Sequence, residues 1–226
     1  MLFRSVDKSL TKLFSKNLIK NPQDIKDRII WQADIDRLKN CDLVIEAVIE
    51  DEMVKREVFH SLAAILKEDA IIATNTSSIS ITRLAQFSGR ANKFIGMHFM
   101  NPVPLMQLIE IILGHHTDED TIISITKVAQ KMGKTTTIVN DYPGFAANRI
   151  LMPMINEAFY ALMEGVASAK DIDLTMKLGC NQPMGPLALA DLIGLDTCLA
   201  ILEVLHKGLG DSKYRPCPLL RKYVEA

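Results

Sequence analysis

Short apolar runs alternate with helical stretches up to about residue 140, and no strand pattern follows. The runs expected to form strands are residues 42–47, 70–73, 94–98, 108–113 and 135–139. The stretches 52–67 and 117–132, and a short one ending at Ala85, carry apolar residues at helical spacing. Strands that alternate with helices predict a parallel sheet with helices packed on its faces.

The pattern changes at Asp141-Tyr142-Pro143-Gly144, because a Pro-Gly pair interrupts regular structure. Beyond it we expect only helices, and the ranges are 145–164, 168–178, 186–193, 196–206 and a last short helix after Pro218. The sequence therefore predicts two domains, an α/β domain over residues 1–140 and an all-α domain over residues 141–226.

Composition limits the class of partner. The 226 residues carry 26 Lys and Arg against 27 Asp and Glu, a net charge of -1, whereas binding nucleic-acid phosphates needs a basic excess. No apolar run approaches the roughly 18 to 20 residues of a membrane span. Cys41, Cys180, Cys198 and Cys217 show neither a CxxC pair nor metal-ligand spacing, which indicates reduced thiols. We expect no nucleic acid, no membrane and no metal.

The amino-terminal residues 1–20 predict an amphipathic helix with a basic row. Lys8, Lys12, Lys16 and Lys20 recur every four residues, with apolar residues at helical spacing between them. A solvated helix face, a mitochondrial transit peptide and a surface for an anionic ligand would all show this pattern. The residues alone leave all three open.

A histidine and an acid in two successive strands are close enough in the sequence to come into contact. His98 ends an apolar run before a Pro-Val-Pro corner, and Glu110 lies inside the next apolar run. A carboxylate buried without a partner is costly. Paired with one imidazole nitrogen, it would fix the tautomer and raise the basicity of the other nitrogen, as in a general base with its orienting partner. The alternatives are a structural histidine and an edge strand that turns Glu110 to water.

Polar residues at the ends of strands and helices add to this candidate site. Asn75, Thr76, Ser77 and Ser78 follow an expected strand, and ligands of open α/β sheets bind beyond the carboxyl ends of strands. Such residues also cap helix starts, which is the simpler explanation. Asn148, in the first turn of the long helix, would either cap that turn or reach into the cleft between the domains.

Several strings together resemble the 3-hydroxyacyl-CoA dehydrogenase family, especially its short-chain 3-hydroxybutyryl-CoA type. They are CDLVIEAVIEDEMVKREVF, ATNTSSISIT, GMHFMNPVPLMQLIEII, YPGFAANRI, NEAFYALMEGVASAKDID and MGPLALADLIGLD. The resemblance covers nearly the whole chain. It implies a Rossmann-like NAD-binding domain followed by a helical substrate and dimerisation domain. The implied reaction is the NAD-dependent oxidation of (S)-3-hydroxyacyl-CoA, such as 3-hydroxybutyryl-CoA, to 3-ketoacyl-CoA.

The resemblance also implies catalytic roles. His98 would be the general base that takes the proton from the 3-hydroxyl of the substrate, and Glu110 would hold and polarise it. Ser77 would hydrogen-bond the substrate oxygen close to the nicotinamide. Asn148 would help to fix both the substrate and His98 from the second domain.

Binding roles follow from the same resemblance. Glu50 and Lys55 would lie along the ribose and phosphates of NAD, with Asn101 near its nicotinamide end. Ser9 and Lys16 would line the CoA site, which favours an anionic ligand for the basic helix. The helical domain would form a homodimer. We expect a cytoplasmic location, with the mitochondrial matrix as the alternative.

One part of the family pattern is missing. Family members begin with a strand, a GxGxxG turn and a helix, whose glycines let the backbone approach the pyrophosphate. Here all 11 glycines stand at or after Gly89, and the closing Gly-rich segment does not appear before Ala226. We therefore expect a fragment truncated at both ends or a misplaced start. The alternative function is an inactive remnant that only dimerises or binds, and the gulonate dehydrogenase and lens-crystallin branch is a third candidate.

Overall fold

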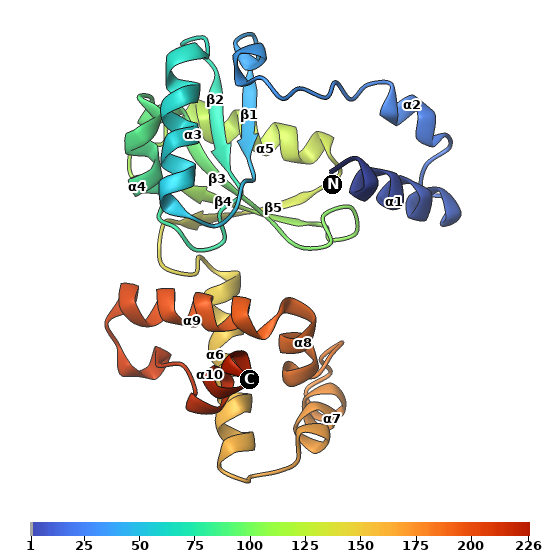
Figure 1. Cartoon of the computed structure of the whole chain (residues 1–226), viewed down its shortest axis with the longest axis vertical. Coiled ribbons are helices and arrows are strands. Elements are labelled where there is room, and N and C mark those ends of the chain that lie inside the picture. Colours follow the sequence, from blue (N-terminus) through green and yellow to red (C-terminus); the bar gives the residue numbers. More distant parts are fainter. Residues whose placement is uncertain (1) are drawn as a thin grey trace.

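The computed structural model describes residues 2–226 and places a sheet domain against a group of helices (Figure 1). Met1, the first residue of the expected basic helix, lies outside the described residues. The strands are β1 (Leu43–Glu46), β2 (Ile71–Thr74), β3 (Phe94–Phe99), β4 (Leu108–Leu113) and β5 (Thr135–Asn140). They form one sheet in the order β1-β2-β3-β4-β5, and each expected strand lies within one residue of these bounds.

The sheet is parallel at three of its pairs and antiparallel between β3 and β4. Residues 100–107 connect these two strands without a helix, whereas a parallel pair needs a crossover of a dozen or more residues. The predicted parallel sheet is thus confirmed for the other pairs, and β4 is the exception. Because β4 runs antiparallel to β3, Glu110 lies directly opposite His98.

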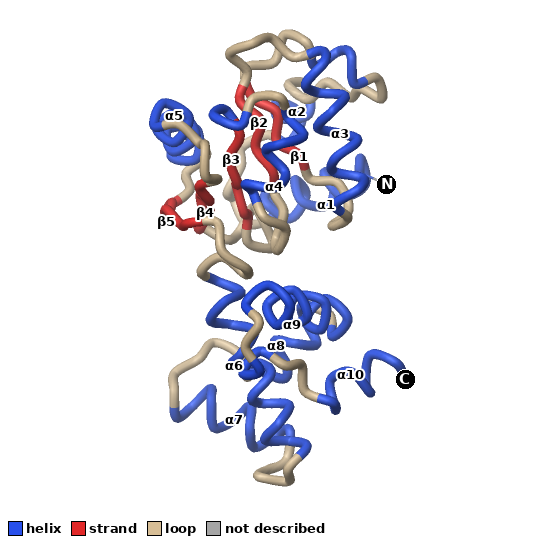
Figure 2. Tube along the Cα trace, turned by 90° about the vertical axis from the view of Figure 1, so that its left-hand side faces the viewer, coloured by secondary structure: helices blue, strands red, loops and turns tan. Residues whose placement is uncertain are grey.

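Helices cover both faces of the sheet. Figure 2 shows α3 (Glu52–Ile65) and α4 (Ile81–Ala85) on one side of the strands and α5 (Glu119–Lys131) on the other. Side chains alternate between the faces. The α3 and α4 side buries Phe59, Leu62, Ile72, Ile81 and Phe94, whereas the α5 side buries Ile95, Ile109, Ile111, Ile125 and Ala129.

Phe59 shows how strongly this core depends on α3. Its side chain is fully buried and meets Phe94 edge to face, with ring centroids 4.9 Å apart. We expect Phe59→Ala to lower the free energy of unfolding by about 3–5 kcal/mol, because it leaves a cavity under α3. The matched control is Glu57→Ala on the exposed side of the same helix, which should stay within about 0.5 kcal/mol of the parent in urea unfolding. Equal stability of the two variants would contradict this account of the core.

The amino-terminal basic row is shorter than predicted. The helix α1 covers Leu2–Ser15 and α2 covers Pro22–Lys26, so Lys16 and Lys20 lie beyond the first helix. Two residues after the end of α1, Asn17 adopts the left-handed conformation with a φ of 57°. The N–H groups of Asn17 and Leu18 donate to main-chain carbonyl oxygens of the last helical turn. Asparagine tolerates this helix-ending conformation better than most residues. The four-residue spacing of lysines therefore continues past the point where the helix stops.

The remaining helices form a second unit with its own core. They are α6 (Ala147–Met163), α7 (Ala169–Gly179), α8 (Pro186–Ile193), α9 (Leu195–Leu209) and α10 (Pro218–Glu225). Met152, Ile155, Phe159, Leu202 and Leu205 are buried together at its centre. The boundary near residue 140 remains a prediction, which this separate core favours. Between residues 2 and 226, no helix is long and apolar enough to cross a membrane.

Candidate active site

A buried histidine–carboxylate pair lies at the turn-back of the sheet. His98 Nδ1 is 2.8 Å from Glu110 Oε2, and the two side chains are only 8% and 2% exposed. The predicted meeting of these residues is confirmed, and the alternative in which Glu110 faces water is wrong. With Nδ1 donating to the carboxylate, Nε2 keeps its lone pair and can accept a proton. Among the side chains of residues 6–226 and the main chain of residues 2–226, Nε2 has no hydrogen-bond partner.

Glu110 also ties this pair to the helical domain. Its other oxygen, Oε1, accepts hydrogen bonds from the N–H of Ala146 at 3.1 Å and of Ala147 at 2.9 Å, where α6 begins. Burial raises the pKa of Glu110, but the hydrogen bonds from His98 and from these two N–H groups outweigh it and hold the pKa below its usual value. The acid beside His98 is therefore buried and ionised.

A tight turn directly precedes α6. Gly144 has a φ of 78°, and a Cβ there would lie 2.6 Å from Leu205 Cδ2, so any other residue would be strained in this turn. Phe145 follows with a φ of 50°, and its ring centroid is 5.8 Å from that of His98. The turn at Pro143-Gly144 therefore not only connects the two domains but also positions the ring of Phe145 beside His98.

Ser77 is held from both domains. Glu50 Oε1 accepts hydrogen bonds from Thr76 Oγ1 at 2.6 Å, from the N–H of Ser77 at 2.8 Å, and from the N–H and Oγ of Ser78 at 3.0 and 3.1 Å. From the helical domain, Asn148 Nδ2 donates to the carbonyl oxygen of Ser77 at 3.2 Å. Asn148 thus reaches from α6 to the sheet domain, and its role toward the substrate remains a prediction. The hydroxyl of Ser77 makes no hydrogen bond to the described side chains of residues 6–226 or to the described main chain, and it can bond a ligand.

The carboxylate of Glu50 predicts a pH-dependent stability. Burial raises the pKa of Glu50, but the hydrogen bond from Thr76, the charge of Lys55 and the bonds from Ser77 and Ser78 lower it overall from 4.5. A folded-state pKa below the unfolded value stabilises the fold above the unfolded pKa, and this contribution disappears as the pH falls through the folded value.

We therefore expect Glu50→Gln to lower the Tm by several degrees at neutral pH. The gap to the parent should stay constant down to about pH 5 and shrink below about pH 4. Thermal unfolding across this range checks it. Glu57→Gln, which changes an exposed glutamate, is the control. A Tm gap that does not depend on pH would show that the ionised carboxylate is not what stabilises the Ser77 turn.

The side chain of Lys55 is buried, whereas a residue that contacts a cofactor directly would need an accessible ammonium group. Its side chain is 1% exposed, and Nζ lies 2.7 Å from Glu46 Oε1 and 3.4 Å from Glu50 Oε2. Glu46 also accepts a hydrogen bond from Thr74 Oγ1 at 2.6 Å. The role of Lys55 toward NAD remains a prediction, and its visible partners are the two acids. Sequence reasoning missed Glu46 and Thr74, although an acid at the end of an apolar strand was a usable signal.

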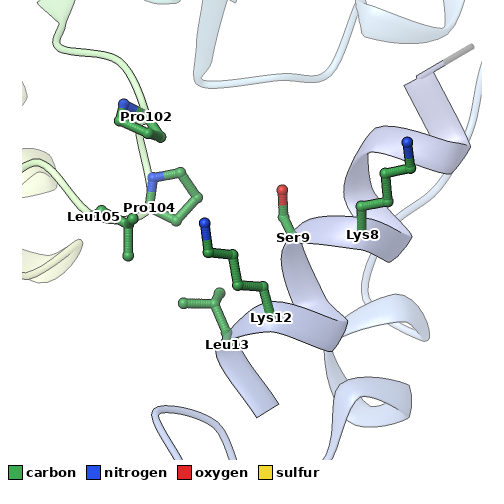
Figure 3. Close-up of a pocket in the computed structure, with 7 residues that line it drawn as sticks. All are labelled: Lys8, Ser9, Lys12, Leu13, Pro102, Pro104 and Leu105. Atoms are coloured by element: carbon green, nitrogen blue, oxygen red, sulfur yellow. The ribbon is translucent and has the colours of Figure 1, made fainter. Parts of the chain in front are cut away.

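Of the two residues predicted to line the CoA site, only Ser9 lines a groove in the structure. Figure 3 shows α1 facing the loop between β3 and β4 across this groove, which is lined by Lys8, Ser9, Lys12, Leu13, Pro102, Pro104 and Leu105. Ser9 points into it as expected. Lys16 is not among the lining residues, whereas Lys8 and Lys12 are. The same loop begins with Asn101, which is exposed.

These groups fit one half of a dinucleotide. Ser77 follows the end of β2 and Asn101 follows the end of β3. A hydroxyl and an amide at these strand ends suit a substrate oxygen and the carboxamide of a nicotinamide beside it. The first 88 residues contain no glycine, so that part of the chain offers no glycine-rich turn through which a pyrophosphate could approach the backbone. The groups present therefore suit the nicotinamide end of NAD, and the cofactor contacts of the individual residues remain predictions.

Comparison with known proteins places the whole chain in one family. Residues 2–142 match the model described as "3-hydroxyacyl-CoA dehydrogenase, NAD binding domain", and residues 144–226 match "3-hydroxyacyl-CoA dehydrogenase, C-terminal domain". The chain belongs to the 3-hydroxyacyl-CoA dehydrogenase family. It is thus an NAD-dependent oxidoreductase, and the expected resemblance is confirmed.

Individual relatives agree with this assignment. A "Probable 3-hydroxybutyryl-CoA dehydrogenase" from Deinococcus radiodurans is 56% identical over 98% of this chain and 80% of its own length. A 3-hydroxybutyryl-CoA dehydrogenase from Bradyrhizobium diazoefficiens is 54% identical over 98% of this chain and 76% of its own. The crystal structure of (S)-3-hydroxybutyryl-CoA dehydrogenase PaaH1 from Ralstonia eutropha matches with a TM-score of 0.95 at 48% identity, covering 99% of this chain and 80% of that one.

Proposed function

We propose that this chain catalyses the NAD-dependent oxidation of a short-chain (S)-3-hydroxyacyl-CoA, such as 3-hydroxybutyryl-CoA, to the 3-ketoacyl-CoA. The buried pair of His98 and Glu110 carries the proposal, because it places a proton acceptor with an ionised partner at the end of β3. There the N–H of Phe99 donates to Asn75 Oδ1, which ties this strand end to the segment that carries Ser77. Relatives at 54% and 56% identity that bear the name 3-hydroxybutyryl-CoA dehydrogenase support the substrate class. The alternative of an inactive, merely dimerising remnant has no observation in its favour.

Oxidation of a secondary alcohol removes one proton and one hydride. NAD, when bound, accepts the hydride. His98 Nε2 takes the proton of the 3-hydroxyl, and the carboxylate of Glu110 stabilises the imidazolium that results. In the reverse direction, protonated His98 donates to the oxygen of the 3-ketoacyl-CoA. Ser77 and Asn148 hold the substrate oxygen toward His98 from the two sides of the cleft.

We assign the groove between α1 and the β3–β4 loop to the CoA part of the substrate. Lys8 and Lys12 bring two positive charges to its rim, and Ser9 adds a hydroxyl. The opposite wall is apolar, with Pro102, Pro104 and Leu105. Cationic and apolar walls suit a ligand that has both phosphates and a long uncharged arm. Lys16 remains a predicted contact that would have to reach this groove from beyond the end of α1.

We also infer a homodimer formed through the helical domain, in a cytoplasmic protein. Large apolar side chains are unusually exposed in this domain, with Ile150, Leu178 and Leu192 on its helices and Val166 between α6 and α7, all 70–76% exposed. Sedimentation equilibrium should give twice 25.2 kDa. The free thiols of all four cysteines suit a reducing compartment, and the mitochondrial matrix is the alternative location.

The activity is tested by mixing the purified chain with NADH and a series of 3-ketoacyl-CoA thioesters. We expect loss of NADH with acetoacetyl-CoA and none with free acetoacetate, because the free acid cannot use the CoA groove. Folded protein that turns over no thioester of the series would contradict the proposal and favour the inactive remnant.

A further inference from the structure

Lys134 is a cation whose visible partners are two main-chain carbonyls. It lies between α5 and β5, and its Nζ donates to the carbonyl oxygens of Val103 and Met106, the latter at 2.6 Å. None of the ion pairs found among the side chains of residues 6–226 includes it. Its positive charge therefore acts on the β3–β4 loop, which lies about 30 residues earlier in the chain.

This loop has little else to hold it. Inside the loop, the N–H groups of Leu105 and Met106 both donate to the carbonyl oxygen of Pro102, at 2.9 and 3.0 Å. Among the described residues, Lys134 is the one residue outside the loop that hydrogen-bonds to residues 101–106. All six of these residues are exposed. The shape of the loop therefore depends on a short internal turn and on one ammonium group.

The position of the loop matters for two neighbours. It begins just after His98 and Phe99, at the end of β3, so it starts at the catalytic pair. Its residues Pro102, Pro104 and Leu105 form one wall of the groove, and Lys8, Ser9 and Lys12 form the other (Figure 3). The two walls come from distant parts of the sequence, so the width of the groove depends on where the loop is held.

We propose that Lys134 is a positioning residue for the acyl-CoA groove, holding the β3–β4 loop at the spacing from α1 that the CoA part requires. The proposal rests on the assignment of this groove to CoA. Without the ammonium group, the loop must be ordered each time the ligand binds, and that ordering weakens binding. The catalytic pair should be much less affected, because Glu110 is fixed by the start of α6 and not by the loop.

Lys134→Met removes the charge and keeps most of the side-chain length. We expect the Kd for free CoA and the KM for acetoacetyl-CoA to rise by about threefold to tenfold, the range for losing one or two hydrogen bonds. The kcat should stay within about twofold, since the pair of His98 and Glu110 is untouched. Lys134→Arg, which can still reach carbonyl oxygens, should recover much of the affinity. Lys131→Met, an exposed lysine at the end of α5, should match the parent.

Calorimetric titration with free CoA separates this proposal from the proposed function. If the parent binds CoA and Lys134→Met binds it equally well, the positioning role is wrong and the groove assignment stands. If Lys134→Met mainly lowers the Tm while Kd and KM keep their parental values, Lys134 is only structural, which also overturns the proposal. A parent that neither binds CoA nor reduces acetoacetyl-CoA would overturn the groove assignment itself, and this inference with it.

Discussion

Replacing His98 by glutamine should lower kcat for the reduction of acetoacetyl-CoA by about 10²- to 10⁴-fold, the range for removing a general acid or base. Glutamine retains a polar group that can reach Glu110, so the buried carboxylate keeps a hydrogen-bond donor and the fold should survive. It has no group that exchanges a proton near neutral pH. The loss should therefore appear in kcat, while the KM for NADH changes little.

Steady-state kinetics with both substrates varied measure this effect. His116→Gln changes an exposed histidine outside the site and should leave kcat within about twofold of the parent. A His98→Gln enzyme that keeps half of the parental kcat would show that another group moves the proton. In that case the buried pair with Glu110 would be a structural feature of the β3–β4 turn.

Replacing Glu110 by glutamine should have the second-largest effect, a loss of about 10²- to 10⁴-fold in kcat. A neutral amide can donate to His98 Nδ1, which selects the tautomer with its proton on Nε2 and so removes the base. The amide oxygen can still accept from the N–H of Ala146 and Ala147, so the junction with α6 is retained. We therefore expect the loss of kcat to arise from the wrong tautomer of His98 and from the missing charge of Glu110, and not from unfolding.

The pH dependence distinguishes this effect from simple misfolding. In the parent, the pKa of Glu110 is held below its usual value, so this carboxyl should stay ionised through the mildly acidic range and not limit the rate there. In Glu110→Gln no negative charge stabilises the imidazolium of His98. The rate should therefore stay low at every pH at which the parent is active. The Tm and the CoA affinity should stay near the parental values. Full activity in this variant would rule out a carboxylate that orients the base.

The pairing of His98 with Glu110 could be predicted from the sequence because local signals agreed. An acid inside the apolar run of β4 had to find a partner if that strand was buried, and the helix-free connection after His98 brought the chain straight back. The same connection explains why β4 is antiparallel. The parallel pattern was inferred from alternating strands and helices, and this one strand pair has no helix between its members.

Other features could not be read from the sequence because they depend on long-range packing. The hydrogen bond from Thr74 Oγ1 to Glu46 joins the ends of two strands that are 28 residues apart in the chain. The contact of Lys134 with the β3–β4 loop needs the register of β4 against β5. By contrast, the missed helix α2 carried local signals, since Asn21 caps it and Pro22 occupies its first turn.

The most direct test of the central claim follows deuterium from NADH into the product. The purified chain is incubated with acetoacetyl-CoA and with NADH that carries deuterium at its transferable position, and the product is examined by mass spectrometry. The account predicts 3-hydroxybutyryl-CoA with one deuterium on the carbon that bears the hydroxyl, formed far more slowly by His98→Gln. Product without deuterium, or deuterated product formed equally fast by His98→Gln, would contradict hydride transfer assisted by His98.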